Sequence, residues 1–229
     1  MLDAAEWGIV ALSLKIGSVA MLVTLPVAYA LAWLLARGRF PGRVVLDAIV
    51  HLPLVLPPVV TGWLLLLAFA PAGPLGGLLD TWFGVGVLFR WTGAAIAAGV
   101  MALPLMVRAI RLSIEGVDRR LESAARTLGA GPARVFWTIT APLSLPGVLA
   151  GMVLGFARAL GEFGATISFV SNVPGETETL PLAIYSALQV PGGEDSVVRL
   201  AAMSVALSLI ALILSEWLVR RGGRQVHVL

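Results

Sequence analysis

The chain of 229 residues contains no cysteine and only two histidines, His51 and His227. The lack of cysteine excludes disulfide bridges, thiolate metal ligands and a cysteine nucleophile, and two distant histidines are too few for a histidine-rich metal site. The phosphate-binding pattern G-x-x-x-x-G-K-[ST] is also absent. If ATP drives this protein, the nucleotide therefore binds to another chain, and we expect neither a cofactor nor a metal ion in this one.

Charged residues are scarce: they make up 13% of the chain, whereas 59% of the residues are hydrophobic and the mean hydropathy is +0.94. A water-soluble domain of this length needs a charged shell around its core, so we expect lipid to be the solvent. A helix needs about 20 mostly apolar residues to cross a bilayer. Five stretches meet this requirement: 9–36, 44–70, 91–110, 135–160 and 200–219.

These stretches predict an all-α, polytopic membrane protein with about five transmembrane helices in a single domain over residues 1–229. Two shorter apolar runs, 163–173 and 180–190, predict re-entrant or interfacial helices. The first long stretch exceeds the length of a signal peptide and lacks an A-x-A-like cleavage site, so we interpret it as a mature helix.

The placement of charge predicts the orientation, because Lys and Arg in short loops stay on the cytoplasmic side. The segments between the basic loops are mostly acidic, which predicts that the N-terminus lies outside and that the C-terminus is cytoplasmic. The pI of about 10.2 then follows from topology, and we expect no nucleic-acid partner. Twelve of the 16 basic residues lie in three clusters, at 37–43, 108–134 and 220–224.

The predicted cytoplasmic loop, at about 113–134, contains the pattern of a short helix. Asp118 is a candidate N-cap, and Gly129 is suited to the left-handed conformation that closes a helix C-terminus. Between them a narrow apolar stripe recurs at spacings of three and four, formed by Leu121, Ala124, Ala125 and Leu128. Spacing alone leaves two interpretations open, insertion into a groove of a partner protein and binding to lipid headgroups.

The same loop resembles the cytoplasmic signature loop of binding-protein-dependent ABC importer permeases, in which E-A-A is followed by three residues, G, nine residues and I-x-L-P. The matching positions are Ala124, Ala125, Gly129, Ile139 and Pro142. Two positions depart from the pattern. Ser123 replaces its glutamate, with Glu122 one residue earlier, and Ala141 replaces its leucine; a displacement of one residue turns a side chain by about 100° around a helix.

The resemblance extends over most of the chain and narrows to the molybdate permeases. It is carried by HLPLVLPPVVTG (51–62), MALPLMVRAIRLSIEGVD (101–118), FARALGEFGATISFVSNVPGETETLP (156–181) and SEWL (215–218). This resemblance implies the type I importer fold, a location in the inner membrane with the N-terminus in the periplasm, and a translocated substrate of molybdate or tungstate. Sulfate permeases share the loop pattern, so sulfate or another oxyanion is the alternative substrate.

The resemblance also implies the partners: a second copy of the chain, two cytoplasmic ATPase subunits that bind Mg-ATP, a periplasmic molybdate-binding protein and the surrounding lipid. It assigns contact with the ATPase to the loop helix, through Leu121, Glu122, Ala124, Ala125, Leu128 and Gly129.

A candidate translocation pathway follows the fourth apolar stretch. Moving a dianion through a low-dielectric layer needs polar groups along the path, and Gly161, Gly164, Thr166 and Ser168 supply glycines and hydroxyls there. Hydroxyls in membrane helices also bond to their own backbone, which is the competing interpretation. Arg158 and Glu162 are four residues apart and predict an intrahelical ion pair, the alternative being that Arg158 attracts the anion.

Two other classes of protein fit the sequence less well. A membrane-embedded enzyme needs a nucleophile with a base or a pair of carboxylates at membrane depth, and neither pattern occurs, so we expect a non-catalytic chain. An ion-coupled secondary transporter shows internal repeats with broken helices in corresponding positions. We find no convincing repeat of the first half in the second.

Overall fold

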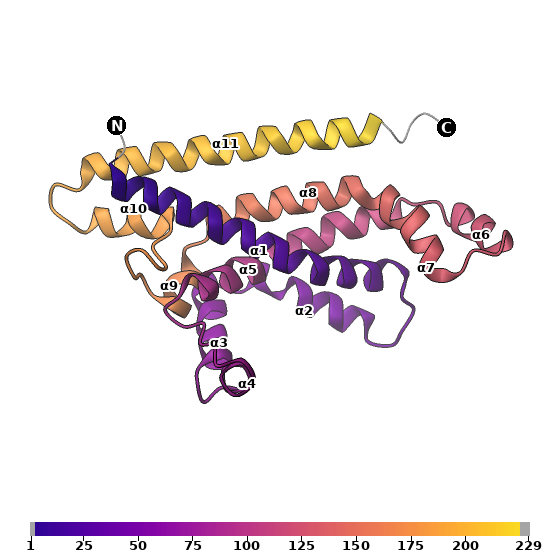
Figure 1. Ribbon diagram of the computed structural model, residues 1–229, viewed down its shortest axis with the longest axis horizontal. Coiled ribbons are helices and arrows are strands. Elements are labelled where there is room, and N and C mark those ends of the chain that lie inside the picture. The colour runs from indigo at the N-terminus through magenta and orange to yellow at the C-terminus, as the bar shows by residue number, and fades with distance from the viewer. Residues whose placement is uncertain (1–2, 225–229) are drawn as a thin grey trace.

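A computed structural model describes residues 3–224, with side chains described except at 83, 215–216 and 218–224 (Figure 1). Every regular element in this part of the chain is helical, which confirms the predicted all-α class. The elements are α1 (Ala4–Arg37), α2 (Arg43–Val55), α3 (Pro58–Phe69), α4 (Pro74–Phe83), α5 (Trp91–Glu115), α6 (Arg119–Thr127), α7 (Pro132–Val135), the π-helix η1 (Phe136–Thr140), α8 (Ala141–Leu160), α9 (Gly164–Val170), α10 (Leu180–Leu188) and α11 (Glu194–Arg224).

Four helices among the described residues are long and apolar enough to cross a membrane: α1, α5, the continuous helix Pro132–Leu160 and the stretch Glu194–Leu214 of α11. The remaining predicted span, 44–70, corresponds to α2 and α3 together. The expected number of about five spans is therefore met only if this bent pair counts as one span.

The second apolar stretch forms two helices instead of one, because α2 and α3 are bent by 115° relative to each other. Pro57 and Pro58 have no amide hydrogen, and a proline also pushes the preceding residue out of the helical region. Leu56 accordingly adopts φ −68° and ψ 142° and ends α2. In Figure 1 α2 runs alongside the bundle, and α3 and α4 project away from it.

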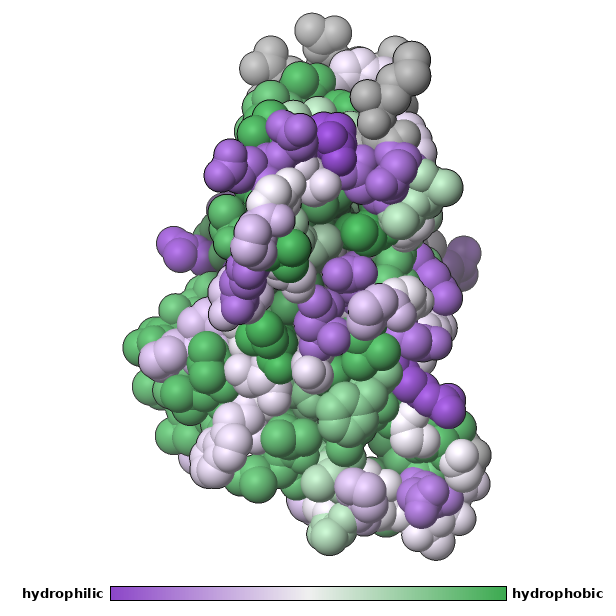
Figure 2. All heavy atoms as spheres, turned by 90° about the vertical axis from the view of Figure 1, so that its left-hand side faces the viewer, coloured by the Kyte–Doolittle hydropathy of each residue, from purple (hydrophilic) through white to green (hydrophobic). Residues whose placement is uncertain are grey.

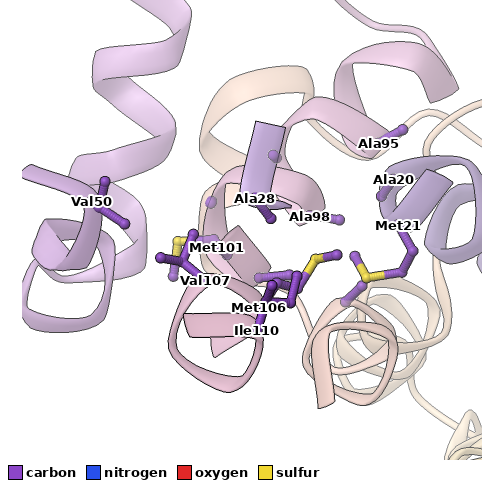
Figure 3. Close-up of a cluster of buried hydrophobic side chains, with 14 of the residues drawn as sticks. Ala20, Met21, Ala28, Val50, Ala95, Ala98, Met101, Met106, Val107 and Ile110 are labelled. Carbon is purple, nitrogen blue, oxygen red and sulfur yellow. The ribbon is translucent and has the colours of Figure 1, made fainter. Parts of the chain in front are cut away.

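The bundle is built around α5, which packs along α1 on one side and α8 on the other. Lipid tails are as apolar as leucine, so helices in a membrane associate through close van der Waals contact, which small residues permit. Buried alanines line α5, and Figure 3 shows Ala98, Met101, Met106 and Ile110 of this helix meeting Met21 and Ala28 of α1.

On α8 three glycines four residues apart face α5 and the centre of the bundle. A Cβ at Gly147 would clash with Ser113, one at Gly151 would lie 3.2 Å from the carbonyl oxygen of Met106, and one at Gly155 would lie 2.6 Å from the Sδ of Met21. The backbone of α8 thus approaches α5 too closely for a side chain at Gly147, whereas at Gly155 the side chains of Met21 and Met106 would have to shift.

The first and last spans are joined at one end of the bundle. Arg199 of α11 donates to Glu6 of α1 through Nε at 3.0 Å and through its terminal nitrogen at 2.8 Å, and the Glu6 side chain is almost fully buried. Glu6 also completes a capping box with Asp3 at the start of α1. Figure 2 shows this end of the molecule, where hydrophilic side chains gather across the upper middle, the centre and the right-hand side, while hydrophobic ones predominate at the left and below.

We predict that Gly147→Ala lowers the thermal stability of the purified protein, because the added methyl group overlaps Ser113 and forces α8 away from α5. Overpacking of this kind costs about 1–3 kcal/mol. Gly8→Ala is the matched control, since Gly8 is an exposed helical glycine with no atom within 4 Å of the added Cβ. An unfolding temperature in detergent that is unchanged in Gly147→Ala would contradict the tight α5–α8 contact.

Candidate functional site

The loop helix has the ends that its sequence predicts. Asp118 caps the start of α6, its Oδ1 accepting a hydrogen bond of 2.8 Å from the amide of Arg120. The chain leaves the helix at Leu128 and turns through Gly129, whose φ of +85° is left-handed. A new helix, α7, begins at Pro132. The predictions for both ends of this helix are confirmed.

The small and apolar residues of α6 lie on an exposed surface at the tip of the molecule (Figure 1). None of the helix residues is buried. Leu121 is 49% exposed and Leu128, just past the helix, is 88% exposed. Ala124 and Gly129 are exposed as well, and Ala125 is half-buried. The structure thus brings together five of the six residues predicted to contact a partner.

The sixth residue, Glu122, is turned toward the rest of the chain. Its Oε1 lies 3.0 Å from a guanidinium nitrogen of Arg37, at the end of α1, and accepts a hydrogen bond of 2.9 Å from the hydroxyl of Thr140, in η1. The side chains of Arg37 and Glu122 are only 12% and 14% exposed. Glu122 therefore differs in environment from the other five residues.

Two of the four residues of the candidate pathway, Gly164 and Ser168, lie where α9 contacts α3. Gly161 ends α8, while a Cβ at Gly164 would lie 2.8 Å from the Cβ of Pro58. Thr166 is buried, and the hydroxyl of Ser168 donates to the carbonyl oxygen of Gly164 at 2.9 Å. In this chain Ser168 therefore follows the backbone-bonding interpretation, and the segment is packed against α3.

Arg158 and Glu162 form the expected ion pair, with 2.7 Å between a guanidinium nitrogen and Oε2 of the carboxylate. The Glu162 side chain is 2% exposed, and its Oε1 accepts a hydrogen bond of 2.8 Å from the amide of Ala165 in the first turn of α9. Glu162 thus neutralises a charge and satisfies a free amide at a helix start. The predicted ion pair is confirmed, but it is not intrahelical, because α8 ends at Leu160 and Glu162 lies in the turn that follows it.

A comparison with known families identifies the chain. Residues 25–223 match the model of the family described as "Binding-protein-dependent transport system inner membrane component". The chain belongs to this family. The protein is therefore a permease, the membrane subunit of a transport system, and α6 is one of its loop helices.

Individual relatives agree with this assignment. The permease is 58% identical over 228 residues to the molybdenum transport system permease protein ModB of Escherichia coli K12, a match that covers 98% of this chain and 100% of the relative. It is 57% identical to ModB of Haemophilus influenzae, covering 94% of each chain. Similarity to the sulfate transport system permease protein CysT of Salmonella typhimurium is lower, at 37% identity over 86% of this chain and 70% of the relative.

Solved structures share the fold at low sequence identity. A bacterial ABC transporter involved in import of the acidic polysaccharide alginate superposes with a TM-score of 0.75 at 18% identity, over 96% of this chain and 80% of the other. The MetNI methionine ABC transporter gives a TM-score of 0.67 at 16% identity, over 95% and 94% of the two chains. These likenesses confirm the importer-permease fold.

The permease also has a charged cluster that hydropathy did not predict. Arg111 of α5 bridges two helices, with one nitrogen 3.0 Å from Asp47 of α2 and its Nε 2.9 Å from Glu115. The Nδ1 of His51 lies 2.9 Å from the carbonyl oxygen of Asp47, one turn earlier in α2. Opposite charges near the inner ends of two predicted spans were the available signal for this contact.

We predict that Glu162→Ala destabilises the permease by about 2–3 kcal/mol, because it leaves Arg158 without its counter-charge and the amide of Ala165 without its acceptor. Glu162→Gln keeps an acceptor for that amide and is expected to lose less. The measurement is thermal unfolding of the purified variants in detergent. Equal stability of Glu162→Ala and the unmodified protein would show that these contacts are dispensable.

Proposed function

We propose that this permease is the membrane-spanning subunit of an ATP-driven importer that carries molybdate and tungstate across the cytoplasmic membrane. The observation that carries the proposal is the identity of 58% to a molybdenum permease over essentially the full length of both chains. The identity of 37% to a sulfate permease is distinctly lower. Molybdate is accordingly favoured over sulfate, and membership of the importer family disfavours an ion-coupled secondary transporter.

The working complex, in this proposal, contains two copies of the chain, two cytoplasmic ATPase subunits that hold Mg-ATP, and a periplasmic molybdate-binding protein. The absence of a P-loop pattern from this sequence is consistent with hydrolysis on a separate subunit. A relative of the same fold has been solved in complex with a substrate-bound periplasmic protein. The N-terminus is periplasmic and the C-terminus cytoplasmic in this arrangement, as the arginine clusters predict.

The exposed residues of α6 and its C-terminal turn are the proposed contact with the ATPase. Leu128 projects from a helix whose other exposed side chains are mostly polar, and burial of such a side chain against a partner is favourable. Ala124, Ala125 and Gly129 have little or no side chain, so a groove in the partner can approach the backbone closely. Leu121 extends the apolar contact by one turn.

The proposed pathway for the anion requires α9 to separate from α3. Thr166 is buried and the Ser168 hydroxyl donates to its own helix in this structure. A tetrahedral dianion needs hydrogen-bond donors to replace its water. Separation of the two helices would expose Ser168, and movement of α9 away from α5, which it also contacts, would help to expose Thr166. Gly161 and Gly164 leave room for the anion or for backbone movement.

The proposed substrate is tested by uptake of labelled molybdate into proteoliposomes that contain the permease, its ATPase subunits and a periplasmic molybdate-binding protein. We expect uptake that requires ATP and is blocked by tungstate but not by an excess of sulfate. ATP-dependent uptake of sulfate would show that sulfate is the substrate instead of molybdate. Uptake of molybdate without ATP would contradict the ATP-driven mechanism.

We predict that Gly129→Glu yields a folded permease that fails to retain the ATPase, because a bulky charge then occupies the C-terminal turn of α6. The matched control is Gly42→Glu. Gly42, between α1 and α2, also has a positive φ, +87°, and no atom within 4 Å of an added Cβ, so it tests the same charge and the same backbone strain at another loop. Co-purification with the ATPase should be lost in Gly129→Glu alone. Retention of the ATPase in both variants would contradict the proposed contact of α6 with the ATPase.

A further inference from the structure

The helix α6 is weakly attached to the rest of the permease. It has no buried residue, and it packs against α7 and η1, the two short elements that follow it. A partner that pushes or pulls α6 moves the long spans only through the few contacts that join them to it. These contacts therefore decide how movement at the cytoplasmic tip reaches the membrane.

The strongest of these contacts is centred on one oxygen atom. Oε1 of Glu122 lies 3.0 Å from Arg37 of α1 and accepts from Thr140 of η1 at 2.9 Å. The same nitrogen of Arg37 also donates to the carbonyl oxygen of Val117, in the turn between α5 and α6, at 3.2 Å. One side chain on α6 thus connects the end of the first span with the start of the fourth.

The burial of these groups makes the connection stiff. Arg37 and Glu122 are nearly enclosed, and Thr140 is buried. A nearly buried charge that loses its partner remains desolvated without compensation, so the two side chains are expected to move together rather than separate. Most surface ion pairs, being solvated, lack this property.

One end of the connection lies at a place where a helix can change shape. Residues Phe136–Thr140 form a π-helix, closed by a hydrogen bond from the amide of Ala141 to the carbonyl oxygen of Phe136. Such turns are rare and occur as single-turn irregularities within helices. Pro142 follows at once and contributes no amide hydrogen. Movement of Thr140 therefore acts on an irregular part of the fourth span, where the regular α-helical hydrogen bonding is interrupted.

We propose that Glu122 is a positioning residue that transmits movement of α6 to α1 and to the π-helical start of the fourth span, and that it makes no contact with the ATPase. The inference rests on the proposed function for the identity of the partner. It separates two roles within one helix: the exposed residues bind the ATPase, and Glu122 holds the helix to the membrane domain.

The variants are Glu122→Ala, Glu122→Gln and the exchanged pair Arg37→Glu/Glu122→Arg, each in the full complex with ATPase and binding protein. We expect the complex with Glu122→Ala to retain the ATPase and to hydrolyse ATP at a normal basal rate. It should, however, consume about tenfold more ATP per molybdate ion imported. Glu122→Gln keeps the hydrogen bonds without the charge and should show a smaller loss. The exchanged pair should restore much of the coupling.

Glu115→Ala is the matched control, because Glu115 is a carboxylate of the same cytoplasmic region whose closest ion pair, at 2.9 Å, is with Arg111 of its own helix. Its ratio of ATP to imported ion should stay unchanged. Loss of ATPase retention in Glu122→Ala, without rescue by the exchanged pair, would overturn the inference by making Glu122 a direct contact. An unchanged ratio of ATP consumed to molybdate imported in Glu122→Ala would also overturn the inference, because the ion pair would then have only a structural role.

Hydrogen exchange of the permease bound to its ATPase tests transmission without reference to the substrate. In the unmodified complex, addition of ATP should alter the protection of residues 119–129 and also of 30–40 and 136–142. In Glu122→Ala only the first change should persist. If the unmodified complex fails to import molybdate, the proposed substrate is wrong, whereas persistence of all three changes in Glu122→Ala overturns the transmission role alone.

Discussion

Close approach of helix backbones is the constraint on which this permease depends. Lipid supplies no hydrophobic drive between helices, so the bundle is held by contacts that only small residues allow. The helix α5 supplies alanines to this contact, and α8 supplies three glycines in register with it. Once these three long helices are fixed, the short elements at the two ends have defined positions: α9 lies against α3 at one end, and α6 extends beyond the bundle at the other.

Much of this arrangement could be predicted from the sequence because lipid imposes simple rules. Apolar length located the spans, and Asp118 and Gly129 located the ends of α6 through their cap chemistry. The spacing of Arg158 and Glu162 was sufficient for their ion pair, since that contact lies along one chain segment from α8 into the turn that follows it. Contacts between residues a few positions apart can thus be predicted from their spacing in the sequence.

The misses concern geometry that spacing does not specify. Pro57 and Pro58 were visible as helix breakers, but the angle of 115° depends on what α3 packs against after the break. The pairing of Asp47 with Arg111 joins residues 64 positions apart and needs α2 beside α5. The direction of Glu122 was likewise open, because a displacement of one position on a helix leaves several faces available until α1 and η1 are in place.

The ion pair between Glu6 and Arg199 restricts the order in which contacts of the bundle can form during synthesis. The two residues are 193 positions apart, so during synthesis the carboxylate of Glu6 enters the membrane region long before its partner has been made. Loop closure over such a distance is slow and depends on the rest of the bundle having formed. The contact can therefore form only after α11 has been made, and a chain that lacks α11 leaves the buried carboxylate of Glu6 without its counter-charge at the start of the first helix.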